Sequence, residues 1–199
     1  MQSEHTPRRG RPPRTTREEV ARVALGLFER AGFDETTVDD IAAAVGVHRR
    51  SLFRYFASKN DIVWGDFDWV LERLRALLAA ADPDAPLMEA LGEAVVASNA
   101  YEPEQQAELR IRMTLITTVP SLQAHSMLRY RAWTDVVAEF VAARLGVPAD
   151  SLVPQTVGQA ALGTSRAAFQ QWVADPASDL EQQLREAYRL LATGFAAAR

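Results

Sequence analysis

The chain contains no cysteine among its 199 residues. Disulfide bonds, thiolate catalysis and cysteine-ligated metals are therefore excluded. The three histidines, His5, His48 and His125, are too widely scattered along the sequence to indicate a shared metal site. We accordingly predict no metal and no other cofactor.

Long apolar stretches are also missing. No apolar run reaches about 18 residues, the length that indicates a membrane-spanning helix. The first 20 residues are rich in arginine and proline and lack the apolar segment of a secretory signal. These features predict a cytoplasmic protein that makes no membrane contact.

Motifs of catalysis and of β-structure are absent as well. The sequence has no Gly-x-Ser-x-Gly element, no phosphate-binding loop and no dinucleotide fingerprint, so it does not indicate an enzyme and no catalytic residue is assigned. Nothing in it resembles a run of alternating strands. What remains is a series of helical patterns separated by proline and glycine, which predicts an all-α fold.

Basic charge is unevenly distributed along the chain. Residues 1–60 hold eleven Arg and Lys against eight Asp and Glu, whereas residues 61–199 hold eleven against eighteen. The overall charge of −4 therefore divides into a positive first part and a negative remainder. Such asymmetry suggests that one end of the chain faces nucleic acid.

The spacing of apolar residues, caps and breaks predicts about nine helices in three regions. Residues 1–14 are expected to be a disordered basic arm, residues 15–60 a three-helix DNA-binding domain, and residues 61–199 a helical bundle for ligand binding and dimerisation. The predicted helices span residues 16–31, 37–45, 48–56, 58–81, 87–100, 104–118, 121–145, 151–174 and 178–197. The long helix at 58–81 joins the DNA-binding domain to the bundle.

Two short helices that meet at Gly46 have the form of a helix-turn-helix, whose second helix enters the major groove of DNA. Side chains at the start of that second helix face base edges, and arginine pairs bidentately with guanine. Tyr55 is expected to reach a phosphate or a thymine methyl, whereas Thr37 and Lys59 suit phosphate contacts. The alternative is a solvated basic face. The predicted base-reading residues are His48, Arg49, Arg50 and Ser51.

The N-terminal arm carries a slim, extended Arg-Gly-Arg-Pro segment at residues 9–12. Such a segment fits a narrow minor groove, where A·T tracts concentrate negative potential. We therefore predict DNA contacts by Arg9, Arg11 and Arg14. The alternative is a solvated, disordered tail.

The bundle combines many aromatic residues with small or hydroxyl-bearing ones, and an apolar cavity with a few polar groups is the usual form of a small-molecule site. For each aromatic the alternative is an ordinary core position, and for His125 it is a satisfied core histidine. The predicted ligand-binding residues are Phe67, Met113, Thr117, His125, Trp133, Ser165 and Phe169.

The last two predicted helices carry apolar and small residues at helical spacing. Pairing of this face with its symmetry mate would form a four-helix dimer interface, and the alternative is packing within one chain. The residues in question are Val157, Ala160, Ala161, Leu162, Leu180, Leu184, Tyr188, Leu191 and Phe195.

The DNA-binding region resembles the TetR family of transcriptional regulators. The resemblance is carried by the pattern Thr-x-x-Asp-Ile-Ala-x-x-Val-Gly-Val at residues 37–47 and by Ser-Leu-Phe-Arg-Tyr-Phe-x-Ser-Lys at residues 51–59. Family members usually have tyrosine where this chain has Phe53. The resemblance implies an all-helical homodimer with a ligand pocket among the central helices and dimerisation through the last two.

Residues 49–68, 119–126 and 137–141 resemble one subgroup of that family in particular. Likeness to this subgroup implies repression of genes for a peptide-derived redox cofactor. Acyl-CoA ligands recur in the wider family, so the resemblance also implies an apolar or amphipathic effector such as an acyl-CoA thioester.

The resulting hypothesis is a dimeric repressor that binds a double-stranded, pseudo-palindromic DNA operator and is released by a small-molecule effector. Two alternatives belong to other classes. One is a ligand-independent architectural DNA-binding protein, and the other is a lipid or small-molecule binder with a vestigial DNA domain. The intact basic recognition helix argues against both alternatives.

Deletion of residues 1–14 should weaken DNA binding and reduce its salt dependence, because fewer counterions are released when fewer cations contact phosphates. The measurement is the slope of log affinity against log salt for the full and shortened chains. An unchanged slope would contradict phosphate contacts by the arm.

Overall fold

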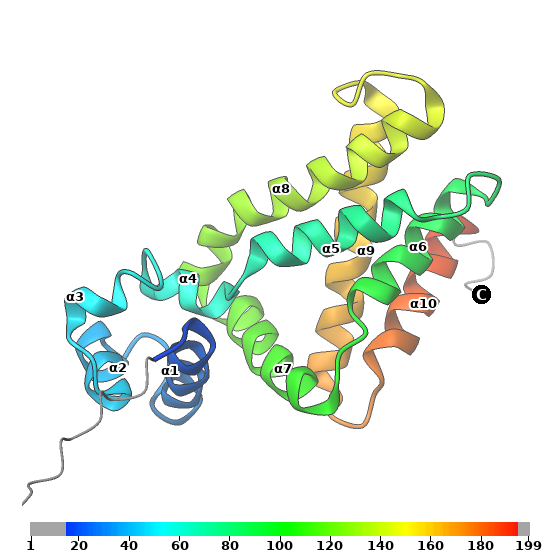
Figure 1. The fold of residues 1–199 in the computed structure, drawn as a ribbon. Helices are drawn as coiled ribbons and strands as arrows, with labels where there is room; N and C mark the ends of the chain where they lie inside the picture. The colour runs from blue at the N-terminus through cyan, green and yellow to red at the C-terminus, as the bar shows by residue number, and fades with distance from the viewer. Residues whose placement is uncertain (1–14, 195–199) are drawn as a thin grey trace, which may run out of the picture. The chain divides into compact units, whose positions relative to one another are not determined.

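The structure is a computed structural model and describes residues 15–194. Within that range it contains ten α-helices and no strand, which confirms the all-α fold class (Figure 1). The chain divides into two compact units, of which the first ends at Ile62 and the second begins at Val63. None of the described helices is long and apolar enough to cross a membrane.

The first unit contains α1 (Arg17–Ala31), α2 (Val38–Val45), α3 (Arg49–Leu52) and most of α4 (Lys59–Trp64). Its helices begin and end through local side-chain and glycine caps. The Thr37 hydroxyl accepts the backbone N–H of Asp40 in a full capping box, and Gly46 ends α2 in the left-handed region with φ 75°. The buried core is apolar and includes Val20, Phe28, Ile41, Leu52 and Phe56.

The third helix is shorter than the residues 48–56 expected from the sequence. Regular helix ends at Leu52, and the next backbone bonds run to the third preceding residue, from Arg54 to Ser51 and from Tyr55 to Leu52. In a continuous helix Phe53 and Phe56 would share one face. The tighter turn instead buries Phe56 and leaves Phe53 44 % exposed.

The second unit is a bundle of six longer helices. They are α5 (Phe67–Ala79), α6 (Leu87–Ser98), α7 (Pro103–Thr118), α8 (Pro120–Leu145), α9 (Leu152–Ala174) and α10 (Leu180–Ala192). In this unit α9 packs against both α8 and α10, and α6 packs against α5 and α10 (Figure 1). Proline occupies the first position of α7 and α8, where its missing N–H costs no helix hydrogen bond.

The single long helix expected at residues 58–81 is divided into α4 and α5. Gly65 adopts a left-handed conformation with φ 62°, and the Asp66 carboxylate accepts the backbone N–H of Trp69 at 3.2 Å to start α5. A glycine followed by a capping aspartate is a local stop-and-restart signal. The division accounts for ten helices where about nine were expected.

Half of the described apolar residues assigned to a dimer face are buried inside the chain, and the others, Val157, Ala160, Leu162 and Leu191, are half-buried. Ala161, Leu180, Leu184 and Tyr188 are between 0 and 3 % exposed and belong to the core of the second unit. Their burial matches the alternative of packing within one chain, because α10 turns its apolar face toward α6 and α9. Phe195 lies outside the described residues.

Substitution of Gly65 by alanine should destabilise the chain more than the same substitution at Gly146. The two glycines have nearly equal φ values, 62° and 65°, so an added methyl costs about 1–2 kcal/mol of backbone strain at each. At Gly65 the methyl would also lie 3.0 Å from the Arg112 guanidinium, whereas nothing lies within 4 Å at Gly146.

Displacement of Arg112 should add about 1–3 kcal/mol, the cost of a lost hydrogen bond from a charged donor. Urea unfolding of both variants at equal protein concentration measures the difference. Equal losses of unfolding free energy in the two variants would show that the hydrogen bonds of Arg112 do not require glycine at position 65.

Candidate functional site

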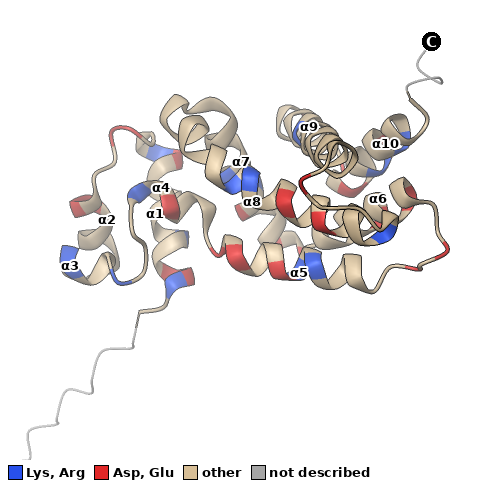
Figure 2. Cartoon of the chain, turned by 90° about the horizontal axis from the view of Figure 1, so that it is seen from above, with Lys and Arg blue, Asp and Glu red and all other residues tan. Residues whose placement is uncertain are grey.

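The first turn of α3 presents consecutive polar side chains to solvent. His48, Arg49 and Arg50 are exposed, Ser51 is half-buried, and basic residues are visible on α3 in Figure 2. His48 is the N-cap of α3 but makes no capping hydrogen bond with its side chain. The Gly46 cap ends α2 two residues before His48.

Arg54 was missed by the sequence interpretation. It is exposed and lines one shallow surface depression together with His48, Arg50, Ser51 and Phe53. The tight turn after Leu52 places Arg54 next to the predicted base-reading residues. A pattern based on a regular helix gave no signal for this position.

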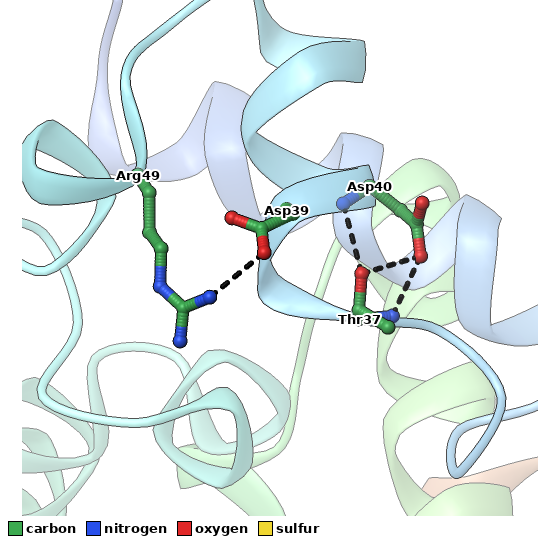
Figure 3. Close-up of polar contacts among 4 residues, drawn as sticks. All are labelled: Thr37, Asp39, Asp40 and Arg49. Atoms are coloured by element: carbon green, nitrogen blue, oxygen red, sulfur yellow. Dashed lines mark hydrogen bonds and ion pairs between the residues drawn. The ribbon is translucent and has the colours of Figure 1, made fainter.

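Arg49 is held from two sides. Its Nη1 donates to Asp39 Oδ2 at 2.7 Å (Figure 3). Its guanidinium carbon lies 5.9 Å from the centre of the Phe53 ring. Both partners of the ion pair remain exposed, at 58 % for Arg49 and 64 % for Asp39. A guanidinium held by one edge in this way keeps its other N–H groups available for a guanine edge.

Three predicted DNA contacts make internal hydrogen bonds instead of presenting all their polar groups to solvent. The backbone N–H and the hydroxyl of Thr37 both donate to Asp40 Oδ2, at 2.8 and 2.6 Å, and these two bonds lower the pKa of Asp40 (Figure 3). The Tyr55 hydroxyl donates to the Thr15 carbonyl at 2.9 Å.

Lys59 is the third of these residues. Its ammonium donates to the carbonyls of Phe33 and Thr36, at 2.8 and 3.0 Å, and lies 4.2 Å from the centre of the Phe33 ring. An ammonium has three N–H donors, so one is left for a phosphate. Arg9, Arg11 and Arg14 of the arm lie outside the described residues.

The second unit contains an apolar cavity of about 130 Å³. Five of the seven predicted ligand-binding residues line it, namely Phe67, Met113, Trp133, Ser165 and Phe169. Thr117 instead lines a neighbouring cavity of about 260 Å³, and its hydroxyl donates to the Met113 carbonyl at 2.7 Å. His125 lines neither of these two cavities.

Several residues around the first cavity were not predicted, among them Trp64, Tyr101, Arg112 and Tyr130. Arg112 donates to the Val63 carbonyl at 2.5 Å and pairs with Glu108, so a charged residue is held at the wall of an apolar space. Burial raises the pKa of Tyr101. Nothing in the local sequence marks these residues, because the cavity is formed by packing of distant helices.

Ser165 connects the cavity wall to the core. Its hydroxyl lies 2.9 Å from the hydroxyl of Tyr188, which is 3 % exposed. Burial raises the pKa of Tyr188, so this tyrosine stays protonated and neutral. The hydroxyl pair therefore links this side of the cavity to α10.

An exposed basic helix-turn-helix and a separate helical unit with an apolar cavity define a DNA-binding transcriptional regulator with a second sensing domain. Comparison with known proteins agrees with this class. Residues 20–63 match "Bacterial regulatory proteins, tetR family", and residues 85–196 match the "MftR C-terminal domain". The chain therefore belongs to the TetR family of transcriptional regulators, which are DNA-binding proteins and not enzymes.

Two curated relatives cover most of the chain. A putative mycofactocin biosynthesis transcriptional regulator, MftR, from Mycobacterium tuberculosis is 40 % identical over 191 residues, which are 96 % of each protein. The regulator TcmR from Streptomyces glaucescens is 30 % identical and covers 87 % of this chain and 80 % of its own length. Regulators of this family bind DNA operators and small-molecule effectors, typically as dimers.

Solved structures show the same fold. The fatty acid degradation regulator FadR from Bacillus halodurans aligns with a TM-score of 0.64 at 18 % identity, over 92 % of this chain and 96 % of its own. Thermus thermophilus FadR, a TetR-family repressor solved in complex with lauroyl-CoA, aligns with a TM-score of 0.56 at 24 % identity, over 89 % and 93 %.

Substitution of Asp39 by asparagine should lower the preference of the chain for its operator over random DNA. The change releases Arg49 from its ion pair and removes a negative charge beside it, so binding to phosphates becomes easier and less selective. An exposed ion pair contributes about 0.2–1 kcal/mol, which corresponds to a change of up to about fivefold in the affinity ratio.

The measurement is competition between an operator duplex and a random duplex of equal length. Glu29→Gln is the matched control, because it removes one exposed acidic charge from α1 of the same unit. If both variants change the ratio equally, the effect is one of net charge and the positioning of Arg49 by Asp39 is refuted.

Proposed function

We propose that the chain is a dimeric repressor that binds a pseudo-palindromic operator through α3 of each protomer and releases it when an effector fills the second unit. The observation that supports this most directly is the exposed turn His48–Ser51 placed after a capped α2. Residues at the start of a recognition helix are the ones that contact base edges. In a dimer the two recognition helices read major grooves about 34–36 Å apart.

The proposed dimer forms through α9 and α10. Since Ala161, Leu180, Leu184 and Tyr188 are buried within the chain, the second copy would pack on the outer faces. Gly163 and Ala167 of α9 are exposed in the protomer, and small residues allow a second helix to approach closely.

The proposed effector is a small apolar or amphipathic molecule of the acyl-CoA type. The lining of the cavity by Phe67, Trp133 and Phe169 suits an acyl segment, and a neighbour of the same fold was solved with lauroyl-CoA. An effector shifts the DNA-binding equilibrium only if it binds the two conformations with different affinity. Arg112 and Val63 both line the cavity, and Val63 belongs to the last turn of α4. An effector that contacts this hydrogen-bonded pair would therefore act on the end of α4.

We propose that the regulated genes are those of mycofactocin biosynthesis, because the chain is 40 % identical to MftR. Footprinting with the full chain should reveal a protected palindromic site upstream of its own gene cluster. Lauroyl-CoA added to the complex should then remove the protection.

Three outcomes would contradict parts of this proposal. Absence of any protected sequence would refute the regulator role at this cluster. Protection that is uniform along the DNA would favour an architectural protein. A specific footprint that lauroyl-CoA does not change, while lauroyl-CoA binds the free chain, would refute release by acyl-CoA.

A further inference from the structure

Two side chains of the second unit are shared by the walls of three spaces. They are Tyr130 of α8 and Arg166 of α9, two helices that pack against each other. Both side chains line the apolar cavity of about 130 Å³, the neighbouring cavity of about 260 Å³ and a surface cleft of about 910 Å³ between the two helices. We call this pair the junction.

The charged end of Arg166 is located by its contact with Tyr130. The guanidinium carbon lies 5.3 Å from the centre of the Tyr130 ring, which is within the range of a cation–π contact. Because that ring lines all three spaces, the guanidinium itself, and not only the aliphatic stem of Arg166, lies at the junction. Arg166 is exposed, so a ligand can reach it.

The guanidinium of Arg166 has hydrogen-bond donors to offer. Within the described residues 15–194 it forms no ion pair and no hydrogen bond with a protein oxygen. Arg112, which lines the apolar cavity too, instead donates to the Val63 carbonyl and pairs with Glu108. A guanidinium carries five N–H donors in a planar fork that matches a carboxylate or a phosphate.

The charges in the walls favour an anion on the cavity side of Arg166. Among the described residues, no Asp or Glu lines either cavity, and Arg166 is a charged residue that both cavities share. The surface cleft is different, because Asp135, Glu139 and Asp150 also line it and would repel an anion.

Polar and apolar groups are separated between the two cavities. Aromatic rings gather in the apolar cavity, and the polar side chains Thr117, Gln123 and Gln170 line the neighbouring cavity together with Arg166. The apolar cavity measures about 130 Å³, and a cavity of about 150 Å³ is large enough for benzene, so a short hydrocarbon segment fits there. This division suits an amphipathic molecule.

We propose that Arg166 binds the anionic group of the effector at the junction while a hydrocarbon segment lies in the apolar cavity. The ligand class is an acyl compound that carries an oxyanion. The carboxylate of a free fatty acid and the phosphates of an acyl-CoA share this chemistry. This inference deepens the proposed effector site and rests on it.

Three probes with the same eight-carbon chain test the inference on the full chain without DNA. Octanoate is ionised at about pH 7.5 and carries its charge at the end of the chain, octanoyl-CoA carries its charge on the phosphates, and octan-1-ol carries none. Binding is read by NMR from the ¹⁵N indole N–H signal of Trp133. This residue lines the apolar cavity, and its signal is identified by its loss in Trp133→Phe.

The variant Arg166→Gln removes the charge and keeps a polar side chain. Affinity for octanoate or for octanoyl-CoA should fall about 3- to 10-fold, because the lost contact is a charge-assisted hydrogen bond at a site open to water. Affinity for octan-1-ol should stay unchanged, which also shows that the variant is folded. The anionic probe that loses affinity identifies the source of the anion.

The matched control is Arg131→Gln. Arg131 is an exposed arginine of α8 that lines the surface cleft and neither of the two cavities. Its replacement changes the net charge by the same amount, so each anionic affinity should change less than in Arg166→Gln.

The inference is overturned if Arg166→Gln leaves both anionic affinities unchanged, if it weakens octan-1-ol equally, if Arg131→Gln has the same effect, or if neither anionic probe binds up to its solubility limit. These results are independent of the footprint. A chain that binds anions through Arg166 but protects no DNA sequence would refute the proposed regulator role and leave the anion site intact. A protected operator combined with unchanged anion binding in Arg166→Gln would do the reverse.

Discussion

Tyr188 is the side chain on which the packing of the second unit depends. Its side chain lies against Gly92 of α6, where an added methyl would come 3.1 Å from its Cβ and 3.4 Å from its ring. Its hydroxyl bonds to Ser165 and donates to the Ala161 carbonyl of α9. A buried tyrosine is stable only if its hydroxyl has a partner. Because Ser165 provides one and also lines the cavity, the contact that joins α6, α9 and α10 also fixes a wall of the effector site.

The first unit depends on short-range electrostatics. Caps and ion pairs at α2 and α3, rather than a large core, decide which polar groups face outward. Asp40 is occupied by the Thr37 cap, Lys59 by two carbonyls and Arg49 by Asp39, which leaves His48, Arg50 and Arg54 as the more freely exposed polar side chains. A net charge of −4 for the whole chain is therefore compatible with a basic surface where DNA is contacted.

Most of the helix limits and part of the cavity lining were predictable. Thr37 and Gly46 act on their own neighbours, so their roles follow from residue type and spacing. The division at Gly65 was missed, although Gly65-Asp66 carries a readable signal, because the apolar stripe on both sides continues at helical spacing. Trp64 and Arg112 could be assigned to the cavity only once α4, α5 and α7 were packed together.

By itself the sequence determined the all-helical class, the helix-turn-helix with its basic turn, and the family, since caps, breaks and motifs depend on residues a few positions apart. Tertiary structure decided which apolar faces are consumed within the chain and which polar groups find partners. The sequence pattern of Leu180, Leu184 and Tyr188 is the same whether these residues form a dimer interface or the core of one chain, because the hydrophobic effect is not directional. Only the packing of α10 on α6 and α9 distinguishes the two.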